Sequence, residues 1–199
     1  RPPCTTQHPS ASVAGVAFST QPVVTVQDAN GNTVTGSTAS IALTLTTGAG
    51  ALGGTATMNA VNGVANFSGK NLSINLVGAD KVLTASSSGL TAATTSPAFT
   101  IIAGTATTIA VDAGNGQSAT AGSAVATDPS VLVTDANGNP KQGVSVTFAV
   151  DTGGGTVDPI SAVTTDASGI ATVTSWTLGT TAGANSLTAT SAGLTGSPV

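Results

Sequence analysis

A nine-residue segment that occurs twice is the feature that most constrains how this chain can fold. Residues 24–32 read Val-Thr-Val-Gln-Asp-Ala-Asn-Gly-Asn and residues 131–139 read Val-Leu-Val-Thr-Asp-Ala-Asn-Gly-Asn, which sets an offset of 107 residues. The same offset pairs residues 14–15 with 121–122, both Ala-Gly. An offset of 104 residues pairs 83–85 with 187–189, both Leu-Thr-Ala. Two copies of one unit therefore fill the 199 residues.

The repeat predicts two domains in tandem, at residues 1–102 and 103–199, each close to the usual size of a single domain. Residues 99–101, Phe-Thr-Ile, have the pattern of the last strand of the first copy. Residues 108–111, Thr-Ile-Ala-Val, have the pattern of the first strand of the second copy. We therefore place the linker between the two domains at Ile102–Thr105.

Both copies consist of short alternating segments broken by Gly, Asn, Asp and Pro. One example is residues 144–148, Val-Ser-Val-Thr-Phe, which precede a glycine triplet at 153–155. Only 6% of the residues are charged and 25 are Gly, a composition that favours strands and turns over helices. The pattern predicts an all-β chain of two antiparallel β-sandwiches. The pairs Asn30-Gly31 and Asn137-Gly138 are predicted to supply the positive φ angles of tight turns.

One strand of each copy changes its alternation part of the way along. Ala171 and Val173 share one face of this strand, whereas Trp176 falls on the opposite parity. The first copy changes in the same way between residues 65–67 and residues 72–76. A strand keeps one face buried across such a change only if its register shifts. We therefore predict a β-bulge or short break in this strand of both copies, and a buried Trp176.

The motifs of the second copy resemble those of a known family. They are Val-Thr-Asp-Ala-Asn-Gly-Asn-Pro, Val-Ser-Val-Thr-Phe, Gly-Gly-Gly, Thr-Asp-Ala-Ser-Gly-Ile-Ala, Trp-Thr-Leu-Gly and Leu-Thr-Ala, at residues 133–140, 144–148, 153–155, 165–171, 176–179 and 187–189. In this order they resemble the group-one bacterial immunoglobulin-like domain of invasins and intimins, over nearly all of the second copy. The first copy carries a looser version and lacks the Trp.

The resemblance implies immunoglobulin-like sandwiches used in tandem on the outside of bacterial cells, and it brings no catalytic residues. We expect a non-catalytic structural or adhesive module of an extracellular, cell-surface assembly such as a filament, stalk or layer. The alternative is a receptor- or carbohydrate-binding adhesin domain. Low charge density favours the first, because small uncharged side chains pack together with little charge repulsion. The expected partners are neighbouring copies or further repeats, or else a host or matrix receptor or a glycan.

No catalytic, cofactor-binding or metal site is expected. The only His is His8, Glu is absent, and the Asp residues lie mainly in turns, so neither a catalytic triad nor a carboxylate pair is predicted. Residues 48–53 spell the dinucleotide fingerprint Gly-x-Gly-x-x-Gly, but a strand-like segment follows where a helix would be needed. Calcium binding lacks the spacing of an EF-hand loop, so turn formation is the favoured role of Asp128, Asp135, Asp158 and Asp166.

Composition also bears on the partners. The net charge is −4, and the four basic residues form no cluster, so nucleic acid is not an expected partner. No apolar run approaches the roughly 20 residues needed to span a bilayer. Sugar binding would need exposed aromatic platforms, whereas strand-like patterns that favour core packing surround Phe18, Phe67, Phe99, Phe148 and Trp176.

The second copy is shorter than the first at its end. Ser96-Pro97 corresponds to Ser197-Pro198, so residues 99–101 have no counterpart before Val199. We expect the second sandwich to lack most of its last strand, which leaves an unpaired edge and an apolar groove for a strand from a neighbouring chain or a further repeat. Cys4 aligns with Val111 and is expected in the first strand of the first copy. It is either a buried thiol or a source of an intermolecular disulfide.

Overall fold

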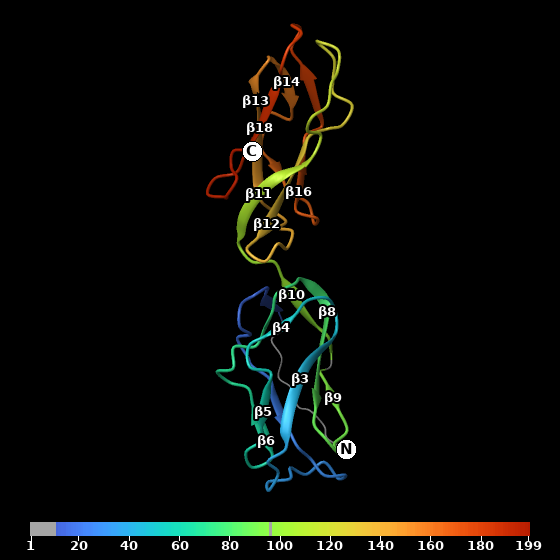
Figure 1. The fold of residues 1–199 in the computed structure, drawn as a ribbon, viewed down its shortest axis with the longest axis vertical. Coiled ribbons are helices and arrows are strands. Elements are labelled where there is room, and N and C mark those ends of the chain that lie inside the picture. The colour runs from blue at the N-terminus through green and yellow to red at the C-terminus, as the bar shows by residue number, and fades with distance from the viewer. Residues whose placement is uncertain (1–10, 96) are drawn as a thin grey trace. The chain divides into compact units, whose positions relative to one another are not determined.

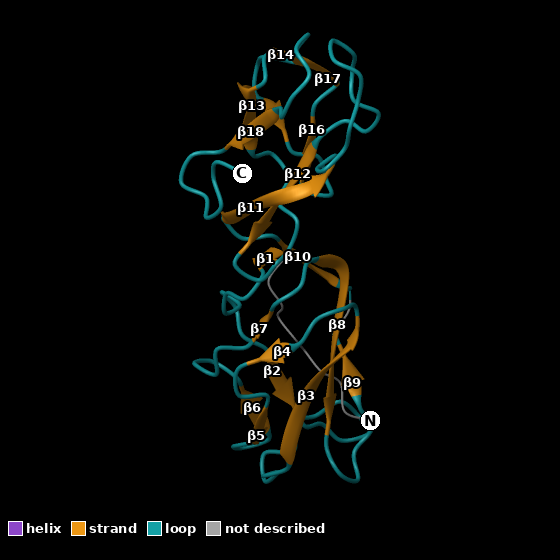
Figure 2. Ribbon diagram, turned by 45° about the horizontal axis from the view of Figure 1, so that its top comes forward, coloured by secondary structure: helices purple, strands orange, loops and turns teal. Residues whose placement is uncertain are grey.

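The computed structural model describes residues 11–95 and 97–199, so Cys4 and His8 lie outside the described residues. Every element of regular secondary structure in the described part is a β-strand (Figure 2), which confirms the prediction of an all-β chain. The chain divides into two compact units (Figure 1), Arg1–Ala103 (unit 1) and Gly104–Val199 (unit 2). Each unit has a hydrophobic core of its own. Within the described residues, no helix has the length and apolarity needed to cross a membrane.

The larger sheet of unit 1 has the strand order β1-β10-β8-β3-β5, with β9 also paired to β8. β3 lies along one edge of β8, and β9 and β10 follow each other along the other edge. β1 pairs with β10 in parallel, which differs from the antiparallel pairing expected throughout. The strands are β1 (Ala11–Val13), β3 (Ser40–Thr47), β5 (Thr57–Asn59), β8 (Gly78–Ser86), β9 (Ala93–Thr94) and β10 (Phe99–Ile102).

The second layer of unit 1 consists of two short antiparallel pairs. β2 (Val23–Thr25) pairs with β6 (Val64–Asn66), and β4 (Leu52–Gly53) pairs with β7 (Ser73–Ile74). β6 and β7 are the two parts of the strand in which the alternation changes. The four core side chains that flank the interruption, two on each side, are fully buried: Ala65, Phe67, Leu72 and Ile74. The predicted break is therefore confirmed.

Unit 2 repeats this arrangement. β11 (Ala106–Ala113), β12 (Ser130–Asp135) and β16 (Ile170–Thr172) form one sheet, and β14 (Gly155–Asp158) pairs with β17 (Ser175–Leu178). The other layer has the order β15-β13-β18, with β15 (Val163–Thr164), β13 (Ser145–Thr152) and β18 (Ser186–Thr190). The break between β16 and β17 matches the break in unit 1. Trp176 is 8% exposed, which confirms that it belongs to the core.

The two Asp-Ala-Asn-Gly-Asn segments form similar turns, as predicted. Gly31 and Gly138 take positive φ angles of 89° and 79°. Neither Asn30 nor Asn137 does, so each Asn-Gly pair supplies the predicted positive φ angle through its glycine alone. The physical reason lies in the Asp side chain. The carboxylate of Asp28 accepts hydrogen bonds from the N–H groups of Asn30 and Asn32, and this closure leaves only the glycine in the left-handed region.

β10 ends at Ile102 and β11 begins at Ala106. Residues 103–105 therefore join the strands of the two units. The predicted linker began one residue too early, because Ile102 still belongs to the last strand of unit 1.

Candidate functional site

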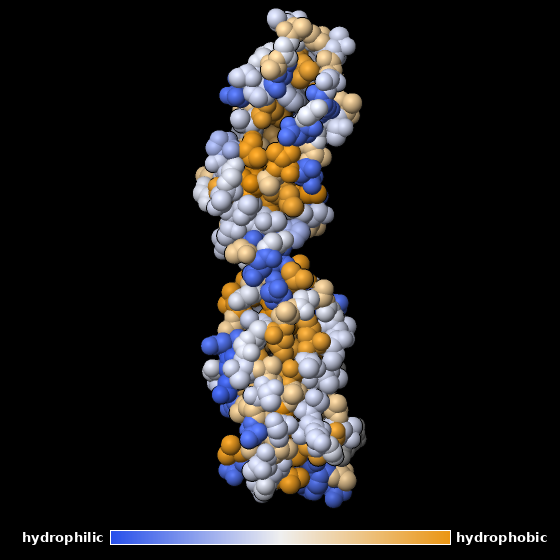
Figure 3. Space-filling model, in the orientation of Figure 1, coloured by the Kyte–Doolittle hydropathy of each residue, from blue (hydrophilic) through white to orange (hydrophobic). Residues whose placement is uncertain are grey.

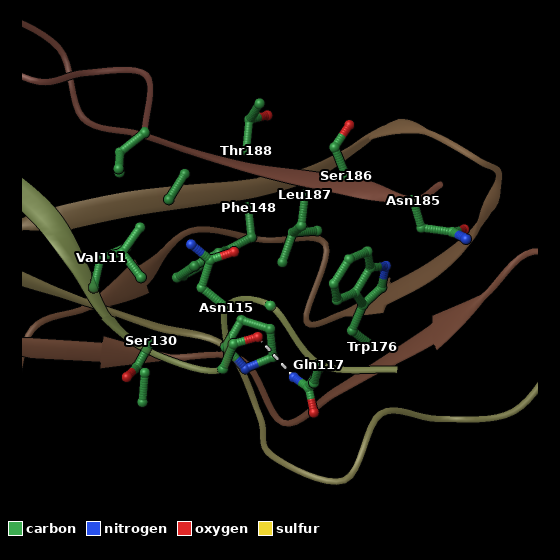
Figure 4. A pocket seen from close by; sticks show the side chains of 17 residues that line it. Val111, Asn115, Gln117, Ser130, Phe148, Trp176, Asn185, Ser186, Leu187 and Thr188 are labelled. Atoms are coloured by element: carbon green, nitrogen blue, oxygen red, sulfur yellow. Dashed lines mark hydrogen bonds between the residues drawn. The ribbon is translucent and has the colours of Figure 1, made fainter. Parts of the chain in front are cut away.

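Unit 2 contains a groove of about 370 Å³ that reaches its core. The floor consists of Val131 from β12, Phe148 from β13 and Trp176 from β17, all of them buried core residues. One wall is the end of β11 with residues 114–117, and the other wall is residues 185–189 in and before β18. The close view shows Leu187 beside Phe148 and Trp176 (Figure 4). The groove therefore opens the apolar interior of unit 2 to the surface.

One edge of β18 lies along this groove. β18 pairs with β13 on its other edge, and no second named strand pairs with it in the part of the chain that the structure describes. Ala189 and Val199 exchange two backbone hydrogen bonds, at 2.8 and 3.0 Å. Alternate residues of a strand direct their N–H and C=O groups to the same edge. The backbone groups of Leu187 therefore point to the same side as those of Ala189, along the groove.

The corresponding edge in unit 1 is covered. Leu83 of β8 corresponds to Leu187 at the offset of 104 residues. The edge of β8 that does not pair with β3 pairs with β9 and β10. Phe99 and Ile101 of β10 are almost fully buried in the core of unit 1. The groove of unit 2 therefore lies where unit 1 has its last strand.

The units also differ at the segment that pairs with β10 in unit 1. β1 (Ala11–Val13) exists as a strand because it pairs with β10. Its counterpart at the offset of 107 residues, Ser118–Thr120, is not a strand. The flanking contacts are kept, since Gly15 donates to the carbonyl of Ile74 in unit 1 and Gly122 donates to that of Gly179 in unit 2. In unit 1, β10 lies between β8 and β1 and pairs with both. In unit 2, no strand lies between the corresponding segments, β18 and residues 118–120.

The side chains that line the groove carry no ionisable group, and apolar side chains gather over β11 and β18 on the face of unit 2 in Figure 3. Most of the polar ones already have partners, among them Gln117 and Ser130 and also Asn185, Ser186 and Thr188. Gln117 donates to the carbonyls of Gly114 and Thr127 at 2.7 Å, and Ser130 donates to the carboxylate of Asp112 at 2.7 Å. The buried indole N–H of Trp176 has no partner among the described residues. The groove can bind by apolar burial and backbone hydrogen bonds, and its lining offers no group for proton transfer.

Asp135 is the most completely bound of the aspartates considered for calcium. It is 3% exposed, and its carboxylate accepts hydrogen bonds from the N–H groups of Gly104 at 2.9 Å, Asn137 at 2.8 Å and Asn139 at 2.9 Å. Burial by itself would raise its pKa. The hydrogen bonds from Gly104, Asn139 and Asn137 outweigh burial and hold the pKa of Asp135 below its usual value. This carboxylate fixes the start of unit 2 to the end of β12.

The other aspartates also have local roles. Asp166 accepts the N–H groups of Ser168 and Ile170, and Asp158 accepts the hydroxyl of Thr174 at 2.6 Å. Asp128 is exposed. Across residues 11–95 and 97–199, no three His, Cys, Asp or Glu side chains lie close enough together to hold a metal ion.

The glycine-rich segment at residues 48–53 surrounds a lysine. Lys81 is 1% exposed, and its ammonium group donates to the carbonyls of Ala49 at 2.6 Å and Val77 at 3.1 Å. A Cβ atom at Gly48 would lie 2.7 Å from Cδ of Lys81, and one at Gly78 would lie 2.8 Å from its Nζ. These glycines therefore make room for a buried lysine. Its last two residues, Leu52 and Gly53, form β4, and the next element along the chain is the strand β5, not a helix.

No protein-family model matches the chain, and no curated protein matches it. Among solved structures, the chain is similar to the D0-D1 domain of intimin, with 19% identity, coverage of 96% of this chain and 89% of that chain, and a TM-score of 0.34. It is also similar to invasin, a bacterial integrin-binding protein, with 20% identity, coverage of 96% and 36%, and a TM-score of 0.41. For FdeC, an Escherichia coli adhesin, the identity is 19%, the coverage 97% and 59%, and the TM-score 0.37.

Proposed function

We propose that this chain is a non-catalytic structural or adhesive module of an extracellular bacterial surface assembly such as a filament, stalk or layer. Its two immunoglobulin-like sandwiches act through their surfaces. Its partners are neighbouring copies or further repeats of the same kind.

The observation that carries the proposal is the repetition itself. Each unit has its own core, the pairings β3-β8, β2-β6 and β4-β7 of unit 1 return in unit 2 as β13-β18, β12-β16 and β14-β17, and three residues join the last strand of unit 1 to the first strand of unit 2. A catalytic fold needs one defined site, whereas a repeated sandwich multiplies similar surfaces. The motifs of the second copy, which resemble the invasin and intimin group, support the same proposal.

The composition supports a structural role over sugar binding. Charged residues make up 6% of the chain, so neighbouring copies can pack with little charge repulsion. Sugar-binding sandwiches present aromatic rings to solvent, and all five aromatic side chains of this chain are buried, including Trp176.

Antibody labelling of the source cells tests the proposed location. Antibodies raised against the purified chain are applied to intact cells and to permeabilised cells, and a cytoplasmic protein serves as the control for leakage. We expect equal labelling of intact and permeabilised cells for this chain, with label outside the envelope in electron micrographs. Label that appears only after permeabilisation would contradict the proposal.

A further inference from the structure

We infer that Asn115 is a site of spontaneous modification, at which the side-chain amide is converted to a carboxylate after attack by the backbone nitrogen of Gly116. The chain contains four Asn-Gly pairs, at residues 30–31, 62–63, 115–116 and 137–138. All four lie within the described residues, and in three of them the fold holds the nitrogen of the glycine in a hydrogen bond. The pair at 115–116 is the exception.

The reaction needs no enzyme and no co-reactant other than water. The backbone nitrogen of the glycine loses its proton and bonds to Cγ of the asparagine, the Cγ–Nδ2 bond breaks, and ammonia leaves with that proton. Water then opens the cyclic imide at either carbonyl and gives aspartate or isoaspartate. Glycine favours the first step because it has no side chain to obstruct the approach of its nitrogen and because its backbone adopts the widest range of conformations. Every Asn-Gly pair therefore has this reactivity, and the fold decides where it is expressed.

Three of the pairs are protected by hydrogen bonds. In the two repeated motifs the glycine N–H donates to the carbonyl of the aspartate three residues earlier, at 3.1 Å from Gly31 and at 3.0 Å from Gly138. Gly63 donates to the carbonyl of Ser37 at 3.1 Å and is buried. Each of these hydrogen bonds must open before the nitrogen can lose its proton and turn toward the asparagine side chain. Reaction at these pairs is therefore limited to moments of local opening.

Asn115 and Gly116 are both exposed and form the tip of a short loop in unit 2. The side chain of Gln117 holds the ends of this loop (Figure 4). Its Nε2 donates to the carbonyls of Gly114 and Thr127 at 2.7 Å, and its Oε1 accepts the N–H of Thr127 at 3.0 Å. Neither the N–H of Gly116 nor the side chain of Asn115 has a hydrogen-bond partner among the described residues. The two reacting groups thus face water at a tip whose ends are fixed.

The position of this tip is independent of the edge of β18. In unit 1 the last strand, β10, pairs with residues 11–13, and their counterparts in unit 2 are residues 118–120. Asn115 and Gly116 precede these residues. A strand paired in the same way in unit 2 would leave the nitrogen of Gly116 outside its ladder.

Conversion of Asn115 adds one negative charge to a chain whose net charge is −4 and of which only 6% is charged. The hydrogen bonds of Gln117 fix the loop on both sides of the tip, so the change stays local and unit 2 remains folded. The modified chain therefore accumulates as a folded and more acidic form of the protein.

Prolonged incubation of the full chain in mildly alkaline buffer provides the test. Peptide mass spectrometry measures the gain of about 1 Da at each of the four asparagines, and an isoaspartate-specific methyltransferase labels the isoaspartate product. We expect Asn115 to react at least about tenfold faster than Asn30, Asn62 and Asn137. The thermal unfolding midpoint of unit 2, followed by the fluorescence of Trp176, should change by no more than a few degrees as the acidic form accumulates.

The chain unfolded in denaturant provides the control for intrinsic reactivity. The rate in the folded chain is divided by the rate in the unfolded chain at each asparagine, which removes the effect of neighbouring sequence. This ratio should be at least about tenfold higher at Asn115 than at the other three. Asn115→Gln lengthens the side chain and disfavours ring closure, so this variant should form no acidic product at the loop and should react unchanged elsewhere. A ratio at Asn115 no higher than the other three, or no reaction there in the folded chain, overturns the inference.

Discussion

The ring of Phe99 stands edge-on to the ring of Phe18, with the ring centroids 5.7 Å apart and the ring planes at 83°. Phe99 belongs to β10, and Phe18 lies in the segment between β1 and β2. The last strand of unit 1 thereby closes the core against the other layer of the sandwich. In unit 2, Val125 stands where unit 1 has Phe18, and the sheet that contains β18 has no strand corresponding to β10. The pair of aromatic rings that joins the last strand to the opposite layer in unit 1 therefore has no counterpart at this position in unit 2.

Replacement of Phe99 should therefore weaken unit 1 strongly. Phe99→Ala removes a buried ring and leaves a cavity, and we expect the free energy of unfolding of unit 1 to fall by about 3–5 kcal/mol. Denaturant unfolding followed by far-UV circular dichroism measures this change. The fluorescence of Trp176 reports unit 2 in the same samples and should keep its midpoint. A loss below about 1 kcal/mol would show that β10 does not seal the core.

Trp176 allows burial to be separated from hydrogen bonding. Its indole N–H has no partner among the described residues, so a smaller apolar ring loses packing but no hydrogen bond. We expect Trp176→Ala to lower the free energy of unfolding of unit 2 by about 3–5 kcal/mol. Trp176→Phe should cost less than half as much. Hydrogen exchange of the amides of β12 and β13 measures both changes without the fluorophore. Equal losses in the two variants would mean that the indole N–H makes a stabilising contact.

Asp135 should stabilise unit 2 by fixing Gly104. Asp135→Ala leaves the N–H groups of Gly104, Asn137 and Asn139 without their acceptor, and we expect unit 2 to lose about 1.5–3 kcal/mol. Asp28→Ala is the matched control, because Asp28 makes similar hydrogen bonds within its turn but is more exposed. Its effect on unit 1 should be smaller. Thermal unfolding of the two variants compares them, and a larger effect of Asp28→Ala would contradict the role assigned to Asp135.

The lowered pKa of Asp135 also predicts an acid dependence of stability. Because the folded state lowers the pKa below the usual value of 3.8, the contribution of this group is complete above that value. It is lost as the pH falls through the lower pKa of the folded state. The thermal unfolding midpoint of unit 2, followed by the fluorescence of Trp176, should fall as the pH is lowered below about 4 in the unmodified chain, and it should fall less in Asp135→Asn. Parallel curves for the two proteins would assign the acid dependence to other carboxylates.

Removal of metal ions should leave stability unchanged. Three of the four aspartates considered for calcium, Asp135, Asp158 and Asp166, already accept hydrogen bonds from backbone N–H or hydroxyl groups. Thermal midpoints measured with EDTA and with added calcium should agree. A decrease of more than a few degrees in EDTA that calcium restores would show that the loops bind the ion.

The repeat and the alternation of apolar residues predicted most of the fold. The change of parity at Phe67 and at Trp176 located the breaks in the corresponding strands, because a strand with one buried face has a strict period of two. The same pattern predicted the burial of Trp176. These signals are local, and the sequence carries them directly.

Contacts between distant segments could not be predicted in the same way. Lys81 lies in the core of unit 1 because carbonyl groups of Ala49 and Val77 meet there, 32 and 4 residues away in the sequence. The glycines at positions 48 and 78 were the only signal of the space that it needs. The hydrogen bond between Gly104 and Asp135 likewise joins residues 31 positions apart. The parallel pairing of β1 with β10 depends on the whole unit.

Electron microscopy of native material taken from the surface of the source cells tests the central claim most directly. Antibodies against the purified chain identify the particles that contain it. If the chain is a module of a surface assembly, the label should follow fibres, stalks or layers, with copies repeated along them. Label found only on separate, monodisperse particles would contradict the account.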